Sequence, residues 1–199
     1  SLSASVTPKR EERFRPRPDD VEEGKAKPID MTRLLGLGPR LIITGGPGSG
    51  KTTFLRLIAA TVARAIRLGD AASVRESLGL VEPLPLPIFI SLSDFNRYRR
   101  RFGESADPRQ GTLMAFISHD LIHQQAVRGL PADFFERLLD GSQGVMLLLD
   151  GLDEVAEERE RVLVSRAVEH LAFNDGVGRV IVTSRTRAYY GDAALAELA

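Results

Sequence analysis

The segment GGPGSGKT at residues 45–52 constrains the fold of this chain more than any other feature. It follows an apolar run at residues 41–43 directly, and it precedes a segment at 55–66 whose apolar residues are spaced by three and four. The apolar run is typical of a buried strand, and the spacing predicts an amphipathic helix. Glycines between them let backbone N–H groups surround an anion, and the start of a helix adds partial positive charge. The sequence therefore predicts a strand, a phosphate-binding loop and a helix in immediate succession.

The side chains of this segment support the same interpretation. It satisfies the pattern GxxxxGK[ST], in which the lysine supplies a full positive charge and the hydroxyl that follows binds Mg²⁺. Lys51 is one of only four lysines in a chain that otherwise uses arginine, and Thr52 is the predicted Mg²⁺ ligand. The residues expected to bind the phosphates of a nucleotide are Gly45, Gly46, Pro47, Gly48, Ser49, Gly50, Lys51, Thr52 and Thr53.

A second motif, VMLLLDGLDE, lies about a hundred residues downstream. Asp150 ends its apolar run, as expected for a carboxylate that holds Mg²⁺ beside a bound triphosphate. Asp153 has two interpretations, as a cap of the next helix or as a catalytic acid. For Glu154 we favour a role in orienting the attacking water over a capping role.

A third motif, VIVTSR, places Arg185 just after an apolar run. A guanidinium there can contact the γ-phosphate of a nucleotide and report its presence. The alternative interpretation is a surface arginine at the end of a strand. Because the other two motifs precede it in order, we favour the phosphate-sensing role.

The pattern along the chain predicts an α/β fold. Strands are expected at 41–44, 88–91, 145–149 and 180–182, and the run at 145–149 is apolar on both faces, which is typical of a parallel sheet covered by helices. Predicted helices separate these strands, at 31–35, 55–66, 71–79, 113–127, 132–139 and 162–173. We expect a three-layer α/β/α P-loop NTPase fold of the ASCE type, with a mostly parallel central sheet.

The chain divides into two parts of unequal size. Residues 1–28 hold mixed charges, prolines and few apolar anchors, so we expect a flexible lead-in there. Residues 29–199 form the predicted nucleotide-binding domain. The proline-rich segment before the strand at 88–91 is interpreted as a stiff connector.

Composition excludes several classes of function. Acidic and basic residues balance at 27 each, so charge alone does not recruit nucleic acid or an anionic membrane. The chain has no cysteine and no apolar run long enough to span a membrane. We expect a cytoplasmic protein, and its arginine-rich composition suggests a prokaryotic source.

Two further patterns are given structural interpretations. His119 and His123 have a zinc-like spacing, but with no third ligand nearby in sequence we expect a solvent-facing helix surface. The run of arginines and aromatic residues at 96–102 could stack on nucleic acid, but its shortness favours a solvated loop.

The three motifs GGPGSGKTT, LLLDGLDEV and IVTSR together resemble the NACHT family of signal-transducing NTPases, a branch of the STAND class. The resemblance covers residues 31–190, and FISLSDF at 89–95 is similar to an intervening strand of that family. Gly151 after the aspartate distinguishes this pattern from the many AAA+ ATPases that have a glutamate there. The proline that often follows the sensor arginine is replaced here by Thr186.

The resemblance implies an ATP/ADP switch that uses Mg²⁺. It implies that residues 45–53 bind phosphate, Asp150 holds Mg²⁺, Asp153 and Glu154 position the water, and Arg185 senses the γ-phosphate. ADP would hold a closed state, and ATP an open state that associates with itself and with other domains of a longer protein. The helical subdomains of that family are not expected before Ala199, nor a fifth strand after Arg185, and the isolated piece is expected to be monomeric.

Alternative activities share these motifs. One is a nucleotide-binding switch without measurable hydrolysis, another is a nucleic-acid-stimulated ATPase, and a third is a small-molecule phosphotransferase. The chain lacks the NKxD segment that reads guanine, which favours an adenine nucleotide.

Overall fold

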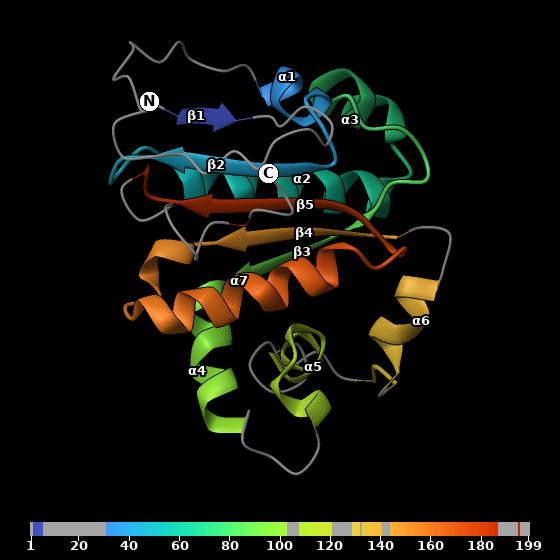
Figure 1. Cartoon of the computed structure of the whole chain (residues 1–199). Coiled ribbons are helices and arrows are strands. Elements are labelled where there is room, and N and C mark those ends of the chain that lie inside the picture. Colours follow the sequence, from blue (N-terminus) through green and yellow to red (C-terminus); the bar gives the residue numbers. More distant parts are fainter. Residues whose placement is uncertain are drawn as a thin grey trace, which may run out of the picture.

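The computed structural model describes residues 2–5, 31–102, 108–120, 129–131, 133–140, 144–186 and residue 195. Figure 1 shows a central sheet with helices packed against both of its faces. In chain order the elements are β1 (Leu2–Ser5), α1 (Met31–Gly36), β2 (Arg40–Gly45), α2 (Lys51–Leu68), α3 (Ala71–Leu78), β3 (Leu86–Ser91), α4 (Leu92–Phe102), η2 (Pro108–Gly111), α5 (Leu113–His119), α6 (Phe134–Asp140), β4 (Val145–Asp150), η4 (Leu152–Glu154), α7 (Glu158–Ala172) and β5 (Val177–Ser184).

The sheet has the strand order β1-β2-β5-β4-β3. The four strands β2, β5, β4 and β3 are parallel, whereas β1 pairs with β2 in the antiparallel direction. Parallel neighbours require crossover connections, and the helices between the strands supply them. The predicted α/β fold with a mostly parallel sheet is therefore confirmed.

Successive residues of the central strands face opposite sides of the sheet. On one side, Met146, Leu148 and Ile181 pack against α1, α2 and α3, in what we call the α2-side core. On the other side, Leu147 and Leu149 pack against α4, α5, α6 and α7, in what we call the α7-side core. Because both faces of β4 are covered, its sequence is apolar at every position from 145 to 149, without alternation.

Helix α2 begins at Lys51, directly after Gly50. Its apolar residues follow the helical period, so they share one face of the helix. Leu55, Ile58 and Val62 are fully buried in the α2-side core, and each stabilises the fold by about 1.5–3 kcal/mol relative to an exposed side chain. The helix ends at Gly69, whose left-handed backbone (φ 67°) lets the capping N–H groups reach the last carbonyls. The helix therefore extends beyond the predicted range of 55–66 at both ends.

Two expectations for the N-terminal and C-terminal parts of the chain differ from the structure or lie outside it. Residues 2–5, which we assigned to the flexible lead-in, form the edge strand β1. Pairing at a sheet edge uses backbone groups, so it needs no alternating side-chain pattern. The rest of the lead-in lies outside the described residues, as does nearly all of the chain after Thr186 where no fifth strand was expected.

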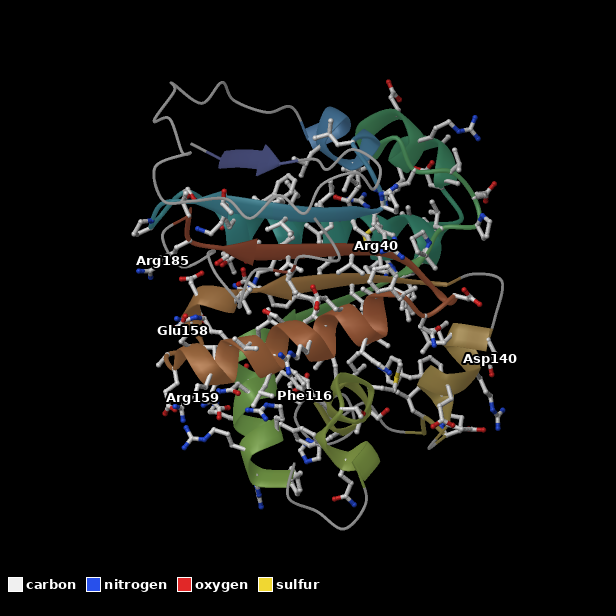
Figure 2. All side chains as sticks on the ribbon, viewed as in Figure 1. Arg40, Phe116, Asp140, Glu158, Arg159 and Arg185 are labelled. Carbon is white, nitrogen blue, oxygen red and sulfur yellow. The ribbon has the colours of Figure 1, made fainter. Side chains whose placement is uncertain are left out.

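The prediction of a solvated loop at residues 96–102 is wrong, because these residues belong to helix α4. Its arginines are the polar face of the helix. The buried face is formed by Leu92 and Phe95, and the Tyr98 ring packs against Phe102 at 4.7 Å and against Phe116 at 5.4 Å. Figure 2 labels Phe116 in this lower part of the molecule.

The expectation of a solvent-facing histidine pair is also not met at His119. Its ring is half-buried and packs against Tyr98 at 5.0 Å and Phe102 at 5.7 Å, so it completes an aromatic cluster. His123 lies outside the described residues. Within the described residues, no group of three or more histidine, cysteine or acidic side chains could hold a metal ion by itself.

None of the helices in the described part of the chain combines the length and the apolar content that crossing a bilayer requires.

Candidate functional site

The three sequence motifs meet at one edge of the sheet. The register pairs Thr44 with Ser184 between β2 and β5, and Ser91 with Asp150 between β3 and β4. All four parallel strands therefore end together, at the left in Figure 1, where the loop before α2 and the turn of η4 also lie. In α/β sheets the carboxyl ends of the strands are the usual place for a ligand.

The glycine loop is shaped by two left-handed residues. Gly48 has a φ of 70° and Gly50 a φ of 87°, values that a residue with a side chain rarely adopts. The Ser49 N–H donates to the Gly46 carbonyl at 3.3 Å, which closes the turn. The sequence therefore needs glycine at these two positions for backbone geometry.

The Lys51 ammonium lies over the same loop. It donates to the carbonyl oxygens of Gly45 at 2.8 Å and Gly46 at 3.2 Å, and it lies 3.4 Å from Ser49 Oγ. These partners are neutral, so the full positive charge of the lysine is not neutralised by any of these three contacts. An anion within the loop would meet that charge directly.

The start of helix α2 reinforces this positive potential. Its N-cap is Gly50, so no side chain caps the first N–H groups, and no acidic residue lies in the first turn. The first helical hydrogen bond, from Phe54 N–H to the Gly50 carbonyl, is 2.8 Å long. Uncapped N–H groups and the helix dipole together favour an anion at such a position.

The acidic motif after β4 is held in a tight turn. Gly151 has a φ of 77°, and its carbonyl accepts the Glu154 N–H at 3.0 Å. Asp150 accepts a hydrogen bond from the Thr183 hydroxyl of β5 at 2.7 Å. Asp150 is half-buried and Glu154 is exposed, so both carboxylates are accessible at the edge of the sheet.

Ser93, in the first turn of α4, lies next to Glu154, and Ser91, at the end of β3, lies next to Ser93. Ser93 Oγ is 3.5 Å from Glu154 Oε2 and 2.9 Å from Ser91 Oγ. Ser91 also accepts the Asp94 N–H at 3.3 Å, at the start of α4. The contact with Glu154 is at the long limit of a hydrogen bond, so it leaves that carboxylate free to accept stronger donors.

Asp153 and Arg185 form an ion pair. Asp153 Oδ2 lies 2.8 Å from Arg185 Nε, and its Oδ1 accepts the Arg185 backbone N–H at 2.9 Å. The Asp153 side chain is 7% exposed, whereas that of Arg185 is 56% exposed. Both oxygens of Asp153 therefore bind Arg185, which connects η4 to the residue that follows β5. Figure 2 shows Arg185 at the left edge of the molecule.

Only some of the predicted site residues contact one another. The structure pairs Asp153 with Arg185, and within the described residues no hydrogen bond joins Thr52 to Asp150. The strand β5 separates β2 from β4, so the strands that lead into the glycine loop and into the acidic motif lie two strand spacings apart, about 10 Å. A ligand that contacts both motifs therefore lies over the end of β5.

The donor groups at this edge fit Mg²⁺ bound with a nucleotide. Mg²⁺ prefers oxygen ligands and commonly uses one or two carboxylates together with substrate phosphates and water. Thr52 offers a hydroxyl, and Asp150 offers a carboxylate whose Oδ1 is held by Thr183.

Sequence reasoning assigned no role to Thr183, Ser91 or Ser93, although all three occur in segments singled out above. The signal was available in part, because small hydroxyl residues at the ends of predicted parallel strands are expected near a ligand. The partners of Thr183 and Ser93 in the acidic motif could not be predicted, because the Thr183 contact joins residues 33 positions apart and the Ser93 contact joins residues 61 apart.

Comparisons of the chain with protein-family models, with curated proteins and with solved structures found no match.

Proposed function

We propose that this chain is a NACHT-type P-loop NTPase core that binds ATP and ADP with Mg²⁺, hydrolyses ATP slowly and acts as a nucleotide-dependent signalling switch. The observation that carries the proposal is the position of Lys51 and the uncapped start of α2 at the same sheet edge as Asp150. A cationic loop and a carboxylate at that edge match the needs of a triphosphate and its metal ion.

Each residue has a distinct task in this proposal. Lys51 and the N–H groups of the loop hold the phosphates, while Thr52 and Asp150 hold Mg²⁺. Bound Mg²⁺ neutralises charge on the triphosphate and helps to orient it for attack. Glu154, which is exposed and only weakly engaged by Ser93, orients the attacking water.

The ion pair between Asp153 and Arg185 favours a second candidate function, a switch without measurable hydrolysis. Both oxygens of Asp153 are engaged, so its carboxylate is not free to accept a proton from water. Arg185 contacts Asp153 through Nε, so a contact with a γ-phosphate would fall to its terminal nitrogens. With Glu154 as the remaining acid, turnover is expected to be low in either case.

The experiment that tests nucleotide binding is a calorimetric titration with ATP and ADP, with Mg²⁺ and with EDTA. Lys51→Ala should weaken binding by about 10-fold to 100-fold, because hydrogen bonds to a charged group contribute about 1.5–3 kcal/mol. The matched control is Arg64→Ala, which removes an exposed positive charge from the same helix outside the loop. No binding by the wild type, or equal losses in both variants, would contradict the proposal.

Phosphate release separates the two candidate functions. Release by the wild type that disappears in both Lys51→Ala and Glu154→Gln supports hydrolysis at this site. Binding without release above background supports the non-hydrolysing switch. Addition of RNA or DNA should leave the rate unchanged, and stimulation by either would favour the nucleic-acid-dependent alternative.

A further inference from the structure

Thr183 is a polar residue at a fully buried position in the middle of the sheet. It lies on β5, opposite Ile43 of β2, and its exposure is 0%. Its immediate neighbour Val182 is also fully buried. A hydroxyl in such a place destabilises the fold unless it is hydrogen-bonded, so its hydrogen-bond partners explain why it is tolerated there.

Both hydrogen bonds of the Thr183 hydroxyl go to the acidic motif. Its Oγ1 accepts the Gly151 backbone N–H at 2.9 Å and donates to Asp150 Oδ1 at 2.7 Å. A hydroxyl has one proton, an N–H can only donate and an ionised carboxylate can only accept. The chemistry of the partners therefore fixes the direction, and the proton points at Asp150.

This arrangement restrains Asp150 at two points through one atom. The bond to Oδ1 fixes the rotation of the carboxylate, which is otherwise a broad and weakly restrained torsion. The bond from Gly151 fixes the peptide that follows Asp150, at the start of the left-handed turn.

We propose that Thr183 is a positioning residue that orients the Asp150 carboxylate for Mg²⁺ bound with the nucleotide, and this inference rests on the proposed function. Groups that orient a metal-binding carboxylate through a hydrogen bond commonly change metal affinity by about 10-fold to 100-fold when they are lost. The residue acts through Asp150 and does not touch the nucleotide.

The test compares Thr183→Val with Thr183→Ser by calorimetric titration of ATP in Mg²⁺ and in EDTA. Valine keeps the shape and removes the hydroxyl, whereas serine keeps the hydroxyl. We expect Thr183→Val to bind ATP in EDTA as the wild type does, within about twofold, and to lose about tenfold or more of the affinity gained from Mg²⁺. Thr183→Ser should retain that gain.

Two results of this comparison would overturn the inference. One is an unchanged Mg²⁺ gain in Thr183→Val, and the other is a loss in Thr183→Ser as large as that in Thr183→Val. Should Thr183→Val not fold, Thr183→Ala replaces it in the same comparison, with thermal melting as the check of folding.

A double-mutant cycle with Asp150→Asn tests whether Thr183 acts through Asp150. In the Asp150→Asn background, Thr183→Val should change the Mg²⁺ gain no further. An additive loss would show a separate structural effect and would overturn the inference. If the wild type binds no nucleotide, or binds it equally with and without Mg²⁺, the proposed function is wrong. If the wild type shows the Mg²⁺ gain and the Thr183 variants do not behave as expected, only the role of Thr183 is wrong.

Discussion

Replacing Gly151 by alanine should weaken the fold slightly and reduce hydrolysis much more. Gly151 has a φ of 77°, in the left-handed region, where a residue with a Cβ costs about 1–2 kcal/mol. A Cβ at this position would also lie 2.9 Å from Glu154 Cδ and 3.1 Å from its Cγ and Oε2. The exposed Glu154 side chain can move at little cost in stability, but its carboxylate must leave its present position.

The expected magnitudes follow from these two effects. For a chain of this size about 1 kcal/mol shifts the melting temperature by roughly 2–4 °C, so Gly151→Ala should lower it by about 2–8 °C. A general base contributes about 10²–10⁴-fold to a rate, so displacing Glu154 should reduce phosphate release by about tenfold or more. The affinity for ATP should stay within about twofold, because the glycine loop is not altered.

The matched control is Gly69→Ala at the C-terminal end of α2, far from the glycine loop. Gly69 has a φ of 67°, and a Cβ added there would meet no heavy atom within 4 Å, so this position carries the backbone strain without the steric contact. It lies about 27 Å from the start of the helix. The assays are thermal denaturation, calorimetric titration with ATP and phosphate release at saturating ATP.

The outcomes separate the two parts of the reasoning. If Gly151→Ala melts at the wild-type temperature while Gly69→Ala melts lower, the strain argument at Gly151 is refuted. If Gly151→Ala loses stability as expected but releases phosphate at the wild-type rate, the position of Glu154 does not matter for hydrolysis. A similar loss of hydrolysis in Gly69→Ala would show that the rate follows stability alone.

Two other substitutions test contacts of β5. Arg179→Met removes two hydrogen bonds of 2.6 Å to the Leu35 and Gly38 carbonyls, made by a guanidinium whose pKa is lowered by burial. The substitution should lower the free energy of unfolding, measured by urea denaturation, by about 2–4 kcal/mol. A loss below about 0.5 kcal/mol would contradict this expectation. Arg185→Gln breaks an ion pair whose guanidinium is more than half exposed, so it should cost under about 1 kcal/mol, while reducing affinity for ATP more than for ADP in calorimetric titrations. Equal reductions for both nucleotides would count against a γ-phosphate contact.

The elements around the glycine loop could be predicted from sequence because local signals agree there. An apolar run, glycines that permit left-handed turns and a helical period follow one another within residues 41–66. The apolar run at 145–149 predicted a strand covered on both faces, and the two cores confirm it. In each case the pattern reflects burial that neighbouring residues in the sequence share.

Helix α4 was missed because its charge obscured its period. Leu92, Phe95, Tyr98 and Phe102 recur at steps of three and four, but arginines between them suggested a solvated loop. One of those arginines, Arg99, forms an ion pair with Glu160 of α7, so its charge is used in packing. Hydropathy alone cannot distinguish a charge that is solvated from one that is paired.

The contacts within the candidate site could not be predicted, because they are tertiary. The sequence indicated that Asp150 and Arg185 both lie near a bound triphosphate, since each follows an apolar run typical of a buried strand. It could not indicate that Asp153 engages Arg185, or that Thr183 engages Asp150, because both depend on the order of β4 and β5 in the sheet.

Because the molecule has two cores, a bound ligand could change the stability of both of them. The glycine loop continues into α2, which belongs to one core, while the segment after Asp150 leads into α7, which belongs to the other. A molecule that contacts both the loop and Asp150 would therefore link the α2-side core to the α7-side core and stabilise both together. Its occupancy would slow amide exchange on both faces of the sheet at once, including in helices that it never contacts.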